Sequence, residues 1–326
     1  MTDAAELERP ACPRCGNHGT REIAEGPDHL HATGLRASVV ECTRCGLWFQ
    51  SPRLPRERHH ELYPADYAPH GEAVAATSAP HPALAAYLAR HRGYAHLGTG
   101  GRGTPLDPFL RWRAGIQLIP AYVAGGRVLD VGCGNGGLLR TLRALGWTDL
   151  HGIEPDPAAA AIARSTGADV RQGAVEDILP GFPAAHFDAI IASMVIEHVA
   201  EPYEVMREIA RALRPGGELL LSTVTRDSLD ARFFGPYWAG FDFPRHMTYF
   251  RDRDIAALFA QRFDRLERFH QLGPIDWVRS ASWRGRPVDR LIARLGRRGM
   301  IAPAIVAAMT GRSTRVSLRA RRTNVP

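Results

Sequence analysis

The fold of this chain is decided by the stretch Arg127-Val-Leu-Asp-Val-Gly-Cys-Gly-Asn-Gly-Gly-Leu-Leu139. Its first five residues predict a short buried β-strand, because three of them are apolar and two of those are β-branched. Leucines at helical spacing come after it, namely Leu138, Leu139, Leu142 and Leu145. The turn between strand and helix is rich in glycine, which leaves the backbone open to a ligand. An open α/β sheet binds its ligand at such a turn, so the stretch predicts a binding site.

The nature of that ligand depends on Asp130. The glycines Gly132, Gly134 and Gly137 satisfy the dinucleotide fingerprint, and Glu154 follows at about 20 residues, the spacing expected for an acid that binds ribose. A carboxylate two residues before the first glycine would repel a pyrophosphate, however. S-adenosylmethionine carries an ammonium and a sulfonium and no phosphate, so Asp130 favours it. The stretch resembles motif I of class I S-adenosylmethionine-dependent methyltransferases, Leu-Asp-Val-Gly-Cys-Gly-x-Gly.

The rest of the chain predicts an α/β fold with a doubly wound, seven-stranded, Rossmann-like sheet. Strands are predicted at 127–131, 150–154, 170–173, 187–193, 218–224, 263–271 and 315–322, the last of them antiparallel. Helices are predicted between them at 107–123, 158–165, 201–213 and 252–261. This alternation is typical of a parallel sheet with helices on both faces.

The resemblance to class I methyltransferases covers roughly residues 107–270 and the last strand, and it implies a set of cofactor-binding residues. In the first turn these are Asp130, Gly132, Gly134 and Gly136. Further along the chain they are Glu154, Pro155, Ala174, Val175, Glu176 and Ser193. Glu154 would hold the ribose hydroxyls, Ala174 and Val175 would pack on the adenine, and Glu176 or Asp177 would accept from its amino group. Ser193 would lie near the methionyl group.

Two histidines and one arginine are candidates for acting on the substrate. His198 follows Glu197 in the segment after the fourth predicted strand, 187–193. In a quinone-modifying branch of the superfamily, an acid three residues before this Glu completes a divalent-metal site; that position is Met194 here, so no catalytic metal is predicted. Arg245 and His246 belong to an aromatic-rich Pro-Arg-His segment that resembles one in a broad bacterial methyltransferase family. Arg245 would pair with an acidic substrate group or with a neighbouring carboxylate such as Asp242.

Each of these candidates has a structural alternative. His198 would then bond the backbone at the start of a helix, while Arg245 and His246 would anchor their loop to the core. Because methyl transfer is an in-line displacement, a base is needed only where the acceptor must lose a proton.

Four of the five cysteines form two CxxC pairs near the N-terminus: Cys12, Cys15, Cys42 and Cys45. This spacing is typical of a zinc ribbon, and four protein ligands leave no open position, so the zinc would be structural. Gly16 and Gly46 permit the tight turn after each pair. A redox motif or a disulfide is the alternative, and both are less common in the cytosol.

The predicted organisation is a zinc ribbon at 1–50, a proline-rich connector at 51–106 and a methyltransferase domain at 107–326. Tyr63 and Tyr67 in the connector would either pack on the surface, the favoured interpretation, or cover the cofactor as a lid. A helical insertion at 274–312 alternates apolar residues with arginines. Such a face lies on an anionic membrane, holds a phosphorylated substrate, or simply covers the substrate pocket as a solvated helix.

We do not expect a nucleic-acid partner, because the positive net charge supports one only weakly. The net charge is +7, but every basic residue is arginine, so a codon bias explains part of the excess. The sequence shows no secretory signal and no apolar stretch long enough to span a bilayer, so a cytoplasmic location is expected.

These features together predict an enzyme that moves a methyl group from S-adenosylmethionine to oxygen or carbon of a small-molecule or carrier-linked metabolite. An RNA methyltransferase is one alternative, although the fourth strand ends Ala-Ser-Met-Val rather than in the Asn/Asp-Pro-Pro-aromatic motif of many enzymes that methylate nucleic-acid amino groups. The other alternative is a non-catalytic scaffold that binds the cofactor and docks to a partner through its ribbon and basic helices.

Overall fold

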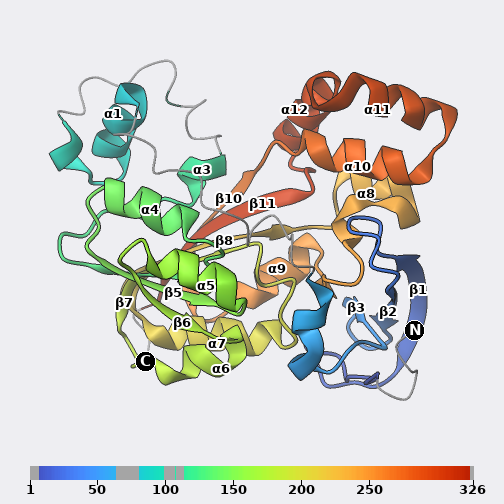
Figure 1. Cartoon of the computed structure of the whole chain (residues 1–326), viewed down its shortest axis with the longest axis horizontal. Coiled ribbons are helices and arrows are strands. Elements are labelled where there is room, and N and C mark those ends of the chain that lie inside the picture. The colour runs from blue at the N-terminus through green and yellow to red at the C-terminus, as the bar shows by residue number, and fades with distance from the viewer. Residues whose placement is uncertain (1–6, 64–80, 99–106, 108–113, 324–326) are drawn as a thin grey trace.

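A computed structural model describes residues 7–63, 81–98, 107 and 114–323, and it places two sheets side by side (Figure 1). The larger sheet has seven strands in the order β10-β11-β8-β7-β4-β5-β6. Their bounds are β4 (Arg127–Val131), β5 (Asp149–Glu154), β6 (Asp169–Gln172), β7 (Phe187–Ser193), β8 (Leu213–Val224), β10 (Phe263–His270) and β11 (Arg315–Arg322). β4, β5, β6, β7 and β8 pair in parallel, whereas β11 is antiparallel to both of its neighbours. The predicted Rossmann-like sheet is confirmed, and the strand order reverses at β4.

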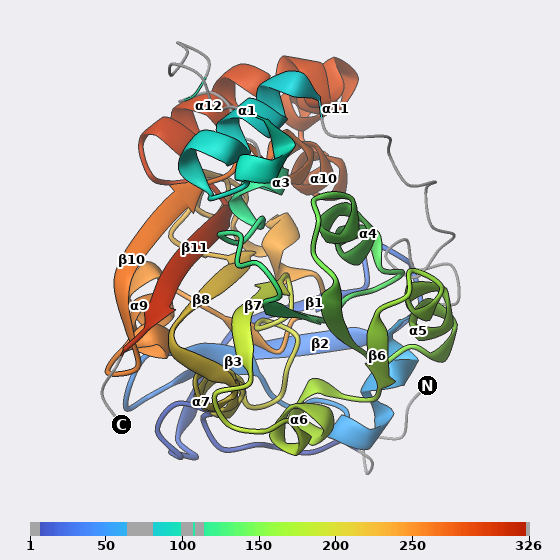
Figure 2. The ribbon, with the colours of Figure 1, turned by 90° about the vertical axis from the view of Figure 1, so that its left-hand side faces the viewer.

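Apolar residues of the sheet alternate between two cores, as a doubly wound fold requires. On one face, Val128 packs in the cluster that contains residues of α1 (Pro82–His91), α4 (Gly137–Ala144) and α5 (Pro157–Arg164). On the other face, Leu129 and Val131 pack with residues of α7 (Pro202–Ala212) and α9 (Asp252–Phe259). Side chains on opposite faces of β4 therefore pack against the two helical layers (Figure 2).

The helix predicted at 107–123 ends earlier than expected. Its described part includes Asp107 and α3 (Ala114–Gln117), which stops six residues before the predicted end. Pro120 disfavours a helical conformation at Ile119 and has no N–H to donate. The carbonyls of Ile119 and Pro120 instead accept hydrogen bonds from Arg92 and from the Tyr94 hydroxyl.

The smaller sheet joins the N-terminal ribbon to the Pro-Arg-His segment. Its strands are β1 (Thr20–Pro27), β2 (Arg36–Cys42), β3 (Trp48–Gln50) and β9 (Thr248–Tyr249), each antiparallel to the next. Ribbon residues such as Leu47 and Phe49 lie in the same core cluster as Ile255 of α9. An ion pair of 2.8 Å between Arg14 and Asp254 adds a polar contact. The ribbon is thus packed into the main body of the protein.

The segment between β10 and β11 is helical, as predicted. It consists of α10 (Pro274–Arg284), α11 (Pro287–Gly299) and α12 (Ile301–Met309). No helix among the described residues is long and apolar enough to cross a bilayer. In the connector, η2 (Arg56–Leu62) leads to Tyr63, whereas Tyr67 lies outside the described residues.

Candidate functional site

The glycine turn after β4 has the backbone geometry that only glycine adopts readily. Gly132, Gly134 and Gly136 have φ values of 68°, 52° and 78°. A Cβ on Gly132 would lie 2.6 Å from a methyl group of Val195. The turn therefore requires glycine both for its conformation and for its packing.

Two buried acids flank this turn. Asp130 and Glu154 are each 3% exposed. The Glu154 carboxylate accepts hydrogen bonds from the backbone N–H groups of Gly134 (2.8 Å) and Asp156 (2.9 Å). Burial and the nearby Glu154 raise the pKa of Asp130 to about 8. In the described part of the chain no hydrogen bond lowers that pKa, so Asp130 is an acid that a cationic ligand would stabilise in its charged form.

The other residues implied for the cofactor follow the carboxyl ends of neighbouring strands. Pro155 comes directly after β5, and Ser193 ends β7, where its hydroxyl lies 2.9 Å from that of Ser222. Ala174 precedes α6 (Val175–Ile178), in which Val175 is buried. Glu176 accepts a hydrogen bond from the Ala200 N–H at 2.9 Å. The structure thus brings these residues to one edge of the sheet, and their roles stay predictions.

The two candidate histidines lie together. The ring centroids of His198 and His246 are 4.6 Å apart and the rings are nearly perpendicular. Glu197 completes the group, because one ligand atom from each of the three residues lies within 4.8 Å of the others. One Glu197 oxygen accepts from the Thr223 hydroxyl at 2.9 Å, and the other is buried and has no hydrogen-bond partner among the described residues.

The electrostatics of this group follow from its burial. Burial raises the pKa of Glu197, which is fully buried. Burial, together with the neighbouring His246, lowers the pKa of His198 to about 3. His198 is therefore neutral at pH 7. Its Nδ1 lies 3.1 Å from the Arg245 carbonyl and 3.2 Å from the Tyr63 hydroxyl, so the connector also reaches this site.

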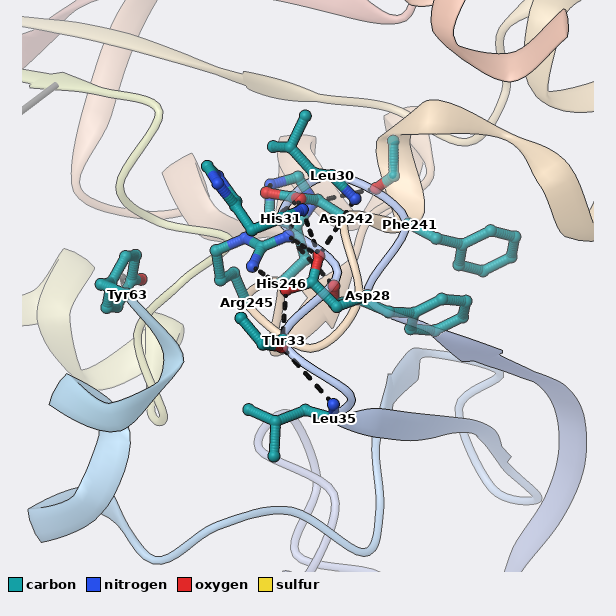
Figure 3. A network of polar contacts seen from close by, with 12 residues as sticks. Asp28, Leu30, His31, Thr33, Leu35, Tyr63, Phe241, Asp242, Arg245 and His246 are labelled. Atoms are coloured by element: carbon teal, nitrogen blue, oxygen red, sulfur yellow. Dashed lines mark hydrogen bonds and ion pairs between the residues drawn. The ribbon is translucent and has the colours of Figure 1, made fainter. Parts of the chain in front are cut away.

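Arg245 is held entirely by protein acceptors. It is 0% exposed, and its guanidinium donates to both oxygens of Asp28 (2.8 and 2.9 Å) and to Asp242 (2.8 Å), as Figure 3 shows. The expected contact with an acidic substrate group is therefore replaced by contacts with these two carboxylates. Asp28 lies between β1 and β2, and its part in the site was not foreseen, since nothing local in the sequence links it to Arg245.

The environment of His246 fixes its tautomer. Its Nδ1 lies 2.8 Å from the Gly240 carbonyl, and because a carbonyl only accepts, Nδ1 carries the proton in the neutral ring. Nε2, with its lone pair, is 3.8 Å from the Asp242 carboxylate. Burial opposes ionisation of Asp242, but the positive charges of His246 in its protonated form and of Arg245 outweigh it and lower the pKa of Asp242. In the neutral ring, Nε2 of His246 is therefore a basic nitrogen beside a carboxylate.

The cysteines form a compact cluster with metal-binding geometry. Sγ of Cys12 is 3.5 Å from that of Cys45, and Sγ of Cys15 is 3.6 Å from that of Cys42. All four sulfurs lie within 4.8 Å of one another. Tetrahedral zinc with Zn–S bonds of about 2.3 Å requires S···S separations of about 3.8 Å, close to these values. Gly16 and Gly46, at φ 68° and 73°, form the turns predicted for them.

The Glu197, His198 and His246 group is a second cluster of metal-ligating side chains in the described part of the chain. Two imidazoles and one carboxylate suit several divalent transition metals. The prediction of no catalytic metal was based on Met194, and the structure instead brings His246 from a distant segment to the Glu197-His198 pair.

Comparison with known proteins identifies relatives of the part of the chain that holds β4 to β8. Residues 108–263 match the family model described as a methyltransferase domain. This part of the chain is similar to methyltransferase domains. The resemblance seen in the sequence is thereby confirmed for these residues, which include the glycine turn and the histidine group.

Curated relatives of this methyltransferase domain include enzymes named ubiquinone biosynthesis O-methyltransferase. The protein of Xanthomonas oryzae pv. oryzae (strain PXO99A) is 40% identical over 110 residues, which cover 32% of this chain and 45% of the relative. That of Xylella fastidiosa (strain 9a5c) is 40% identical over 110 residues, or 44% of its length. The chain thus spans about half the length of the curated relatives that it matches. Among solved structures, a methyltransferase of Thermotoga maritima aligns with a TM-score of 0.44 at 19% identity, covering 64% of this chain and 85% of that one.

Proposed function

We propose that this protein transfers a methyl group from S-adenosylmethionine to a hydroxyl oxygen of a small molecule. The observation that carries this proposal is the pairing of His246 with His198 at the end of β7, with a free Nε2 on His246. Oxygen acceptors must lose a proton as the new bond forms, whereas a base has no such role when an uncharged amine attacks. The relatives named as O-methyltransferases support the same acceptor.

The residues present fit the cofactor. The glycine turn would admit it to the backbone, Asp130 would face its cationic methionyl end, and Glu154 would accept from its ribose hydroxyls. When bound, S-adenosylmethionine supplies an electrophilic methyl group. The four cysteines would hold a structural zinc ion, since they offer four thiolates and no open position.

In this proposal His246 is the general base. Its Nε2 takes the hydroxyl proton as the acceptor oxygen attacks, and Gly240 keeps the lone pair on that nitrogen. The ionised Asp242 at 3.8 Å then stabilises the imidazolium. Arg245 acts as a positioning residue, because it fixes Asp242 and touches no substrate.

The histidine assignment is tested with radiolabelled S-adenosylmethionine and a panel of phenols and alcohols as acceptors. His246→Ala is expected to lower the turnover number by about 100-fold or more while leaving the cofactor Kd unchanged, since general bases contribute roughly 10²–10⁴-fold. His60→Ala, at an exposed histidine of η2, is the matched control.

An unchanged rate in His246→Ala would return His246 to a structural role. A rate that depends on added Mg²⁺ or Mn²⁺ in the wild-type protein would assign the Glu197, His198 and His246 group as a metal centre instead. Calorimetry that detects NADH binding and no S-adenosylmethionine binding would overturn the cofactor assignment altogether.

Cofactor affinity is expected to increase with pH up to about pH 8. Asp130 is protonated below its raised pKa of about 8, and a cationic ligand needs the carboxylate, so binding at lower pH must release a proton. The association constant should fall by up to roughly tenfold per pH unit below that pKa. Calorimetry in two buffers of different ionisation enthalpy measures the proton release directly.

Asp130→Asn provides the control for this dependence. It should bind S-adenosylmethionine more weakly and with no proton release across the same range. A wild-type Kd that is constant between about pH 6 and pH 8 would contradict the role of Asp130.

A further inference from the structure

The helix α12 turns its large side chains outward. Its buried positions are the alanines Ala304, Ala307 and Ala308. Its exposed positions are Ile301 (46%), Ile305 (36%), Val306 (54%) and Met309 (70%). A helix that covers a core in water shows the opposite distribution, with large apolar residues inside. Another surface is therefore expected to cover the outer side of α12.

The preceding helix continues this surface. Val288, Leu291 and Leu295 of α11 recur at helical spacing and are 48%, 56% and 50% exposed, while Ile292 faces inward. We call these three residues, together with Ile301, Ile305, Val306 and Met309, the apolar face. Seven large apolar residues exposed on two consecutive helices mark an interaction site.

Arginines border the apolar face without compensating acids. The exposed guanidinium groups belong to Arg286, Arg290, Arg294, Arg297 and Arg298. The only acid of α11 and α12, Asp289, is buried and paired with Arg284 at 2.7 Å, and the sequence contains no Asp or Glu after it. In the described part of the chain, Arg290, Arg294, Arg297 and Arg298 have no ion pair.

This charge distribution indicates which kind of partner covers the apolar face. A second copy of the chain packed face to face would bring like-charged arginines together, which disfavours a symmetric dimer. An anionic surface that also accepts apolar side chains complements both properties of the face. We propose that α11 and α12 bind the surface of an anionic lipid bilayer, with the apolar face inserted at the headgroup boundary and the arginines against lipid phosphates.

The position of the face suits this contact. α11 and α12 lie at the end of the molecule opposite α6 and α7 in both views (Figures 1 and 2). Beneath them, α10 contacts the loop that leads to His246, where the Ser280 hydroxyl accepts from the Ala239 N–H at 2.8 Å. Bilayer contact would therefore place the acceptor site one helical layer from the lipid, within reach of a membrane-soluble substrate.

The test is co-sedimentation of the full chain with vesicles of phosphatidylcholine alone and of phosphatidylcholine mixed with phosphatidylglycerol. Strong binding is expected only to the anionic vesicles, and it should weaken as salt rises. Arg290→Gln with Arg294→Gln should weaken binding about 25-fold, since each arginine near an anionic surface contributes roughly fivefold. Ile305→Ser with Met309→Ser should weaken it at least tenfold through lost apolar insertion, with no loss of thermal stability.

Arg207→Gln is the matched control, because Arg207 is an exposed arginine on α7 at the opposite end of the molecule. It should bind vesicles like the wild-type protein. Binding that is absent, or equally reduced by Arg207→Gln, would overturn the proposal. A concentration-dependent dimer that Ile305→Ser with Met309→Ser dissociates, without vesicle binding, would overturn it in favour of self-association.

Discussion

Asp28→Ala is expected to lower the free energy of unfolding by about 3 kcal/mol and to reduce methyl transfer, although Asp28 belongs to the ribbon and lies far from the glycine turn in sequence. The side chains of Asp28 and Arg245 are both 0% exposed and 2.8 Å apart. Removing one partner of a buried pair leaves the other charge without compensation, which typically costs about 3–5 kcal/mol. The lower end applies because Asp242 still contacts Arg245.

The expected loss of turnover follows from a chain of contacts that leads from Asp28 to His246. Asp28 holds Arg245, Arg245 holds Asp242, and Asp242 faces His246. Loss of Asp28 should therefore lower the turnover number while the Kd for S-adenosylmethionine, proposed to bind at the glycine turn, stays constant. If Asp28 had only a structural role, its loss would lower stability without lowering the turnover number selectively relative to the Kd.

The same hairpin offers a matched control. Glu25 pairs with Arg36 at 2.8 Å, but both side chains are 58% exposed. Glu25→Ala should change the unfolding free energy by at most about 1 kcal/mol and leave turnover unchanged. Equal effects of the two variants, measured by chemical denaturation, would show that the Asp28 pair has no special part in the site.

Cys42→Ser is expected to have the second large effect, the loss of bound zinc and of the folded ribbon. Zinc sites with thiolate ligands contribute about 10–16 kcal/mol in isolated zinc-finger peptides, so the ribbon should not stay folded without the metal. Because Cys42 and Leu47 share a core cluster with Ile255 and Leu258, the melting temperature of the whole chain should fall.

Metal analysis measures this prediction directly. The wild-type protein should contain one zinc per chain, and Cys133→Ser should retain it, since Cys133 is a buried cysteine outside the cluster. Zinc-free wild-type protein of unchanged stability would contradict the proposed ribbon site.

Local patterns in the sequence predict much of this fold. The glycine turn, the two CxxC pairs and the strands β7 and β11 appear where the apolar and cysteine patterns predict them, because each depends on residues close together in the chain. The helix before β4 was predicted too long, because the tertiary contacts of Ile119 and Pro120 outweigh their apolar periodicity.

The candidate site could be predicted only in part. Its histidines are visible as motif residues, but their proximity depends on the packing of the Pro-Arg-His segment against the end of β7. The Asp28 and Arg245 pair joins two segments at opposite ends of the chain, and a single sequence shows no signal for such a pairing. The orphaned oxygen of Glu197 is likewise a property of the assembled core.

The two-residue strand β9 has a consequence for how the chain is made. β3 pairs with β2 on one side and with β9 on the other, through Trp48 with Tyr249 and Phe49 with Thr248. During synthesis the ribbon emerges first, yet the outer edge of β3 has no partner until Thr248 has left the ribosome. The nascent ribbon therefore exposes an unpaired strand edge, prone to pairing with other chains, until the segment that carries His246 has been synthesised.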